Sequence, residues 1–247
     1  MISRNKISMG LFCDSTPYAN LEKDTEAVVL NKLNLKDIIQ VDFPNDQYVR
    51  KQSDKKQIVL HHTVSGQGVN GDIAWWRQTT QRIGTQIIVD WEGKIYQCFS
   101  SKYWAYHLGA GNYKLDKHSI GIEIDSWGGL VKHNRSWYPA KWDKKNKKYI
   151  ANLAHKPIKN VQKYPKGFRG FYGYEKYTDK QIEAVRKLLV YWNEQYDIPL
   201  DYNEDMFDVS DKALDGQDGV WTHVSFREDK SDCHPQPELI DMLKSLS

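Results

Sequence analysis

Metal-binding side chains occur in three short stretches of the chain. His61 and His62 follow a short apolar run, His223 lies later in Trp-Thr-His-Val, and Lys230–Pro235 reads Lys-Ser-Asp-Cys-His-Pro. A catalytic zinc ion takes three protein ligands from His, Cys or carboxylate groups and leaves a fourth position for water. On its own, a His-His pair is better explained by a strand that ends in two polar rings and binds no metal. The three stretches together predict a zinc-dependent hydrolytic site.

Two further residues can complete such a site. Ser119–Asp125 alternates isoleucine with polar residues or glycine, which is typical of a strand with one buried face. Glu123 lies on the open face, so it is the candidate base that takes a proton from metal-activated water. Lys230 can stabilise the negative charge of a tetrahedral intermediate.

The elements that must position these residues alternate between strands and helices. Gln57–Thr63 is a predicted strand, and Asp72 can cap a helix that runs to about Ile83. Thr85–Val89 and Lys94–Phe99 are predicted to form a hairpin across an Asp-Trp-Glu-Gly turn.

The C-terminal half continues this alternation. Thr178 and Gln181 form a predicted capping box that opens a helix ending before Pro199. Val220–Val224 is a predicted strand and Pro237–Leu246 a terminal amphipathic helix. The sequence therefore predicts an α/β fold with a central mixed β-sheet flanked by helices.

Charge is distributed unevenly along the chain. Residues 130–169 contain twelve Lys or Arg and a single acid, Asp143, a formal charge of +11, whereas the rest carries −8. This aromatic-rich stretch lacks helical periodicity, so we predict an insertion at about 130–173 made of loops and a hairpin. It carries no phosphate loop or nucleic-acid motif, so no nucleic-acid partner is expected. A solvated insertion, an extension of a glycan- or peptide-binding groove, and a contact to anionic wall polymers all stay open.

Residues 1–43 are predicted to be an N-terminal extension of unknown role, with a helix within Leu21–Leu35. No apolar run approaches the ~20 residues that span a bilayer, so no stable membrane association is expected. Ser8 and Gly10 break the apolar stretch behind the basic start, so we expect no signal peptide and a cytoplasmic location in the producing cell. Three scattered cysteines do not indicate a disulfide framework.

Five motifs occur in the order seen in a known family. The chain resembles zinc-dependent N-acetylmuramoyl-L-alanine amidases of the type 2 amidase fold, a group that includes phage lysozyme-like amidases and peptidoglycan recognition proteins. The resemblance covers roughly residues 44–128 and 174–246, so we expect the amidase domain to span residues 44–247. Its motifs are IVLHHTVSG, IGTQIIVDWEGKIYQ, WAYHLG, SIGIEID and H-x6-K-S-D-C-H-P.

The resemblance implies a set of zinc ligands. In the family's His-His-Thr motif the first histidine is the ligand, which corresponds to His61, and the second histidine ligand corresponds to His223. Alignment on Lys230 and the trailing proline makes Asp232 the third ligand. Cys233 is the alternative, because thiolate is a softer zinc ligand.

The resemblance also implies the other roles. Glu123 and Lys230 are the catalytic groups, since this chain has Thr85-Gln86 where many relatives carry a tyrosine. The WAYHLG segment implies that His107 and Trp104 lie beside the substrate groove, with His107 as a substrate contact or a structural histidine and not a ligand. Period-2 alternation turns His62 to the other face of its strand, as a supporting or substrate-contacting residue.

The implied activity is hydrolysis of the bond between N-acetylmuramic acid and L-alanine in peptidoglycan. The chain resembles a monomeric, cell-wall-lytic phage endolysin that acts on the wall after release by a holin-type partner. A cytosolic amidase that recycles soluble muropeptides and a non-catalytic peptidoglycan-binding module of the same fold stay open as alternatives.

Overall fold

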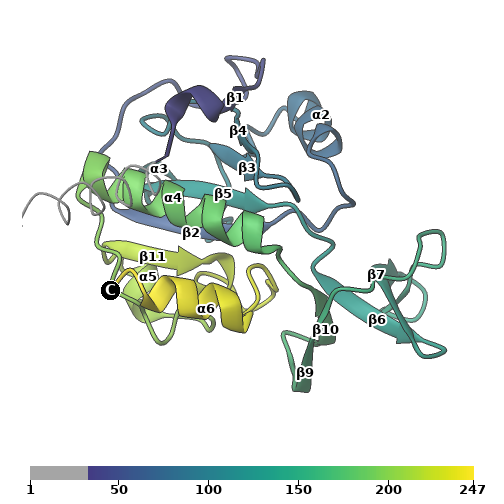
Figure 1. Cartoon of the computed structure of the whole chain (residues 1–247). Helices are drawn as coiled ribbons and strands as arrows, with labels where there is room; N and C mark the ends of the chain where they lie inside the picture. Colours follow the sequence, from purple (N-terminus) through teal and green to yellow (C-terminus); the bar gives the residue numbers. More distant parts are fainter. Residues whose placement is uncertain (1–32) are drawn as a thin grey trace, which may run out of the picture. The chain divides into compact units, whose positions relative to one another are not determined.

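The computed structural model describes residues 33–247 (Figure 1). The helix predicted within Leu21–Leu35 lies outside the described residues except for its last three positions. Of those positions only Leu35 is helical, as the first residue of a short 3-10 helix, η1 (Leu35–Asp37). Among the helices of residues 33–247, none is long and apolar enough to cross a bilayer.

A six-stranded mixed sheet forms the centre of the fold, as the sequence predicted. Its strand order is β1-β4-β3-β5-β2-β11, and every neighbouring pair is parallel except the hairpin β3-β4. β2 is buried along its whole length, as expected for an interior strand covered on both faces. The strands are β1 (Ile39–Gln40), β2 (Gln57–His62), β3 (Ile87–Val89), β4 (Ile95–Gln97), β5 (Ser119–Ile124) and β11 (Gly219–Thr222).

Helices cover both faces of this sheet. α4 (Asp179–Tyr196) begins with the predicted capping box of Thr178 and Gln181. It buries Val185, Leu189 and Trp192 in the main hydrophobic cluster, together with strand residues such as Ile87. α6 (Pro237–Lys244) packs beside α4 (Figure 1). The remaining helices are α3 (Tyr113–His118), α5 (Asp211–Leu214) and the 3-10 helix η2 (His223–Ser225).

The opposite face is covered by α2 (Asn70–Gln78). Its Ile73 and Trp76 belong to a second buried cluster that contains Ile88, the β3 residue between two that face the main cluster. The predicted helix was wrong at both ends. Asp72 lies in its first turn instead of capping it, and the helix ends at Gln78 because Thr79 takes an extended conformation.

The start of the described chain contributes to the central sheet. β1 pairs with β4 in parallel, through Ile39 with Tyr96 and Gln40 with Gln97. Phe43 is buried in the second cluster. Residues 33–43 of the predicted extension therefore pack on the core, and the domain boundary at residues 43 and 44 stays a prediction.

Residues 129–175 form a second sheet instead of loops and one hairpin. It is antiparallel, in the order β8-β7-β6-β10-β9. Two tight turns explain why this sheet was not predicted. Asn134-Arg135 joins Gly129–His133 to Ser136–Asp143, and Arg169-Gly170 joins Val161–Phe168 to Phe171–Glu175. All four turn residues have positive φ. Such turns match strand twist, but three of these residues are not glycine. The strands are β6 (Gly129–His133), β7 (Ser136–Asp143), β8 (Lys148–Ala151), β9 (Val161–Phe168) and β10 (Phe171–Glu175).

The second sheet is tied to the core by polar contacts. Arg169 pairs with Asp208 at 2.6 Å, and the Tyr164 hydroxyl lies 2.8 Å from Nδ1 of His234. The buried carboxylate of Glu175, at the end of β10, accepts the backbone N–H of Trp127 at 2.7 Å.

Candidate active site

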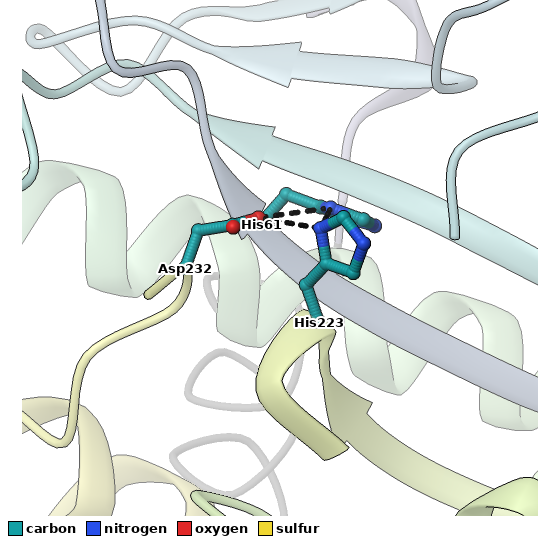
Figure 2. A group of neighbouring side chains, drawn as sticks. All are labelled: His61, His223 and Asp232. Atoms are coloured by element: carbon teal, nitrogen blue, oxygen red, sulfur yellow. Dashed lines mark hydrogen bonds and ion pairs between the residues drawn. The ribbon is translucent and has the colours of Figure 1, made fainter. Parts of the chain in front are cut away.

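Three ligand atoms from separate parts of the chain converge at the carboxyl end of the central sheet (Figure 2). His61 is the penultimate residue of β2, His223 begins η2 directly after β11, and Asp232 follows in a loop. The two Nδ1 atoms lie 3.0 Å apart, and Asp232 Oδ2 lies 3.2 Å from that of His61 and 2.8 Å from that of His223. All three residues are buried.

Sheet register explains this convergence. β2 and β11 are parallel neighbours in which Leu60 pairs with Thr222. In both segments the next residue along the chain is a histidine, so both imidazoles lie at the same end of the sheet. The turn of η2 follows at once, and it allows the chain to bring Asp232 back to the pair, where Val224 N–H donates to its backbone carbonyl at 3.0 Å.

The spacing of the three atoms fits a small tetrahedral metal ion. Zinc bonds of about 2.0–2.1 Å to nitrogen and oxygen place neighbouring ligand atoms roughly 3.3 Å apart. The pKa of His61 is lowered to about 4, by burial first and then by His223. Burial alone would raise the pKa of Asp232, but the two histidines outweigh it and hold that pKa well below its ordinary value. The set therefore offers the neutral imidazole and ionised carboxylate that a metal requires.

A hydrogen bond at Nε2 of His223 determines which nitrogen of the ring carries the proton. Nε2 lies 2.8 Å from the backbone carbonyl of Leu108. A carbonyl only accepts, so Nε2 carries the proton and Nδ1 presents its lone pair to the site.

A chain of hydrogen bonds through His107 determines in the same way which nitrogen of His61 carries the proton. The Ser119 hydroxyl donates to the Leu115 carbonyl at 2.8 Å, so its oxygen accepts from Nε2 of His107, also at 2.8 Å. His107 Nδ1 is then an acceptor for His61 Nε2, 2.9 Å away. The network assigns the proton of His61 to Nε2 and leaves its Nδ1 bare.

One buried carboxylate holds both of these supports in place. Asp116 Oδ1 accepts the backbone N–H groups of His107 at 2.8 Å and of Leu108 at 2.9 Å. Asp116 thus fixes the turn that supplies the His107 ring to His61 and the Leu108 carbonyl to His223.

Glu123 lies beside this group with an unused oxygen. It pairs with His61 across β5 and β2, and its Oε2 is buried without a hydrogen-bond partner among the described residues. Burial raises the pKa of Glu123 well above its ordinary value, as do the charges of Asp232 and Asp72, while Lys230 opposes them. A carboxyl group of this kind has a high proton affinity and no internal partner, which suits proton transfer.

A pocket of about 400 Å³ joins these groups. The predicted residues on its lining are His61, His62, His107, Glu123, His223, Lys230 and Asp232. Trp104 is not on this lining. Its ring lies against Tyr106 and Tyr113, and its backbone pairs with Val49.

Cys233 points into the core, away from the three ligand atoms. Its thiol lies 3.0 Å from the Tyr177 hydroxyl, and burial raises its pKa, so the thiol stays protonated. The same hydroxyl accepts the backbone N–H of His234 and lies 2.9 Å from Nδ1 of His62. His62 Nε2 is buried without a partner among the described residues. Of the two candidate third ligands, only Asp232 has its ligand atom beside both histidines.

Sequence reasoning missed several residues of the site. Asp72 and Trp75 of α2 line the pocket, the latter 57% exposed. Asp72 accepts a hydrogen bond from Ser65 at 3.0 Å. The acid at the start of α2 was assigned to capping, and the tryptophan next to the buried Trp76 gave no signal. Ser119 and Asp116 act behind the ligands, and only the folded chain brings them there.

Comparison with known proteins gives one family and several solved structures. The family model described as N-acetylmuramoyl-L-alanine amidase matches residues 51–237. Comparison with curated protein sequences gives no match. PlyL is 14% identical with a TM-score of 0.48, over 85% of this chain and 98% of that one. LysC from Clostridium intestinale URNW, an N-acetylmuramoyl-L-alanine amidase, is 14% identical with a TM-score of 0.44, over 84% and 95%. An AmpD derivative is 14% identical with a TM-score of 0.47, over 85% and 96%.

Proposed function

Because the chain belongs to the N-acetylmuramoyl-L-alanine amidase family, we propose that it is a zinc-dependent enzyme that cleaves peptidoglycan. The bond hydrolysed is the amide between the lactyl group of N-acetylmuramic acid and the L-alanine of the stem peptide. One observation carries this proposal: within residues 33–247, three candidate ligand atoms and a carboxylate whose Oε2 has no hydrogen-bond partner meet in one pocket.

In this proposal His61, His223 and Asp232 hold the zinc ion. When bound, zinc lowers the pKa of a coordinated water and polarises the carbonyl of the scissile amide. The protein's contribution is to keep both Nδ1 atoms deprotonated, through the Leu108 carbonyl and the His107 ring. His107 is therefore a positioning residue that acts through His61.

Glu123 supplies the proton transfers. Its carboxylate takes a proton from the attacking water as the water oxygen bonds to the amide carbon. The same group then delivers that proton to the alanine nitrogen as the carbon–nitrogen bond breaks. The raised pKa of Glu123 suits both steps, because a stronger base is a better acceptor and its acid still protonates an amine leaving group.

Lys230 lines the pocket, and its positive charge counteracts the negative charge of the carboxylates there. Its charge acts on both His61 and Glu123. We assign it to stabilise the oxygen that becomes negative when the carbonyl carbon turns tetrahedral. Preorganised charge of this kind needs no rearrangement during the reaction.

Substrate contacts come from the remaining pocket lining. Trp75 offers an exposed aromatic face, and Asp72 offers a carboxylate held by Ser65. The His62 ring lies with its Nδ1 2.9 Å from the Tyr177 hydroxyl, so we assign His62 a supporting role. Trp104 lies outside the pocket lining, and its ring packs against Tyr106 and Tyr113, so we assign it a structural role beside the groove.

The biological role that we propose is lysis of the cell wall by an endolysin-type enzyme, released with the help of a holin-type partner. The formal charge of +11 on residues 130–169 supports a wall-directed protein, since opposite charge raises the rate of encounter with an anionic envelope.

Release of L-alanine amino groups from purified sacculi and from soluble muropeptides tests this function. Zinc-loaded protein is expected to cleave both and to act on sacculi efficiently. Cleavage of soluble muropeptides alone would identify a recycling amidase. Absence of zinc binding and of cleavage on either substrate would identify a binding module.

A further inference from the structure

We propose that the second sheet binds an anionic wall polymer made of phosphate groups and sugar or polyol units. The proposal rests on the wall-directed function above, and it assigns a separate binding site to residues 129–175. Its evidence is the charge, the exposed aromatic rings and the hollow of this sheet.

The charge of the sheet is almost uncompensated. Residues 130–169 contain ten lysines, all exposed, and Asp143 is the single acid. Within residues 33–247 none of these ten lysines forms an ion pair, whereas Lys176, Lys180 and Lys244 each meet a glutamate. Asp143 instead accepts from the backbone N–H of Lys145 and from Asn146 at the tip of the β7-β8 hairpin. The charge is therefore available to a partner.

Aromatic side chains gather on the same sheet and remain exposed. Trp142, Tyr149 and Tyr172 are 48%, 50% and 61% exposed. Trp142 and Tyr149 meet edge to face at 5.0 Å between ring centroids, and Tyr149 lies 4.8 Å from the buried Phe171. The buried Phe171 ring thus holds Tyr149 in place, and Tyr149 in turn contacts Trp142.

A hollow of about 480 Å³ brings charge and rings together. It is lined by residues of β6, β7, β8 and β10, and Lys132 Nζ lies 6.0 Å from the centre of the Trp137 ring. The lining that we assign to binding is Lys132, Trp137, Lys148, Tyr149, Phe171 and Tyr172.

The chemistry of this lining favours one occupant. Ring faces pack against the C–H faces of sugars, and ammonium groups attract phosphates. Lysine is a mobile point charge, which suits a flexible polymer with repeated phosphates better than one fixed anion. A polymer chain fits into this hollow better than the flat surface of a membrane does. The rest of the protein is acidic at −8, so a polyanion is directed to this sheet alone.

Binding of a labelled, glycosylated poly(glycerol phosphate) to the full-length protein tests the site. Lys132→Gln/Lys148→Gln is expected to weaken binding about 25-fold at low salt, because each lysine near an anionic surface contributes about fivefold. Tyr149→Ala/Tyr172→Ala is expected to weaken binding without removing charge. Lys51→Gln/Lys212→Gln removes two exposed lysines elsewhere and should leave binding unchanged.

Two comparisons decide the occupant. At equal phosphate concentration, the polymer should bind more tightly than a single-stranded oligonucleotide or phosphatidylglycerol vesicles, and tighter binding to either overturns the proposal. Equal binding by the Lys132→Gln/Lys148→Gln variant and wild type also overturns it.

Hydrolysis of a soluble muropeptide that lacks the polymer separates this proposal from the amidase function. The Lys132→Gln/Lys148→Gln variant should cleave it as wild type does. Polymer binding without any cleavage by wild type would remove the amidase function and leave the binding site standing. Cleavage without polymer binding would do the reverse.

Discussion

His61 and Glu123 are direct neighbours across the parallel strands β2 and β5. Paired residues of neighbouring strands place their side chains on the same face of a sheet. Glu123 also pairs with Ile88, which packs in the cluster below α2. The first metal-ligand candidate and the candidate base are thus fixed to one another by backbone register, on the face that carries the pocket.

Replacing the carboxylate should separate catalysis from metal binding. Glu123→Gln keeps the size of the side chain and removes the proton acceptor, so we expect kcat to fall about 10²- to 10⁴-fold. Zinc content, measured by elemental analysis, should stay at the wild-type level. Near wild-type turnover in this variant would show that another group accepts the proton.

Metal binding should depend on Asp232 and not on Cys233. Asp232→Asn removes the anionic ligand atom, and we expect it to lose zinc and activity together. Cys233→Ser is the matched control, because the thiol contacts Tyr177 and not the two histidines. Loss of zinc from Cys233→Ser, with zinc retained in Asp232→Asn, would reverse the assignment.

Removal of the metal should lower thermal stability as well as activity. A ligand that binds only the folded state stabilises it by about 2.7 kcal/mol at one hundred times its Kd. Chelated protein should therefore unfold at a lower temperature, and added zinc should restore both Tm and activity. Asp232→Asn should show no such response in calorimetry, and a zinc-dependent rise of its Tm would contradict the site.

The support behind His61 should tune metal affinity. His107→Ala removes the acceptor for His61 Nε2, and we expect zinc affinity to fall 10- to 100-fold. His107→Gln, which can still accept that proton, should recover part of the loss. His118→Ala removes a half-buried histidine whose Nδ1 lies 2.8 Å from the Asp54 carbonyl and which is not part of the relay to His61, and it should bind zinc normally. Competition with a fluorescent chelator measures all three.

Glu175 should make stability depend on pH. Burial raises the pKa of Glu175 to about 7 from its ordinary 4.5. Between these values the folded state holds a proton that the unfolded state has lost, so the free energy of unfolding falls as pH rises. The loss is roughly 3 kcal/mol and is complete above pH 7.

Glu175→Gln should remove this dependence, because the amide oxygen still accepts the Trp127 N–H and carries no charge. Urea unfolding at pH 5 and pH 8 measures the difference, with Glu228→Gln, an exposed position, as control. A constant difference in stability between Glu175→Gln and wild type across this range would refute the assignment.

Local sequence signals predicted the elements that hold the candidate site. The capping box of Thr178 and Gln181 marked the start of α4, and the alternation around Glu123 marked β5. The order of motifs along the chain indicated the family, and residues 51–237 match its model.

Features that depend on distant pairing were not predictable. The relay from Ser119 through His107 to His61 exists because separate segments of the chain meet in the folded protein. β1 is two residues long, too short for any periodicity. The second sheet is built on turns at Asn134 and Arg169, residues that tolerate positive φ less readily than glycine does.

The sequence separation of the ligands sets an order of events during synthesis. His61 is 162 residues from His223 and 171 from Asp232, and β11 must pair with β2 before the three can meet. The hairpins of residues 129–175 are local and can form early, whereas the metal group needs the last pairing of the central sheet. A nascent chain therefore cannot assemble the three candidate ligand atoms until synthesis has passed Asp232.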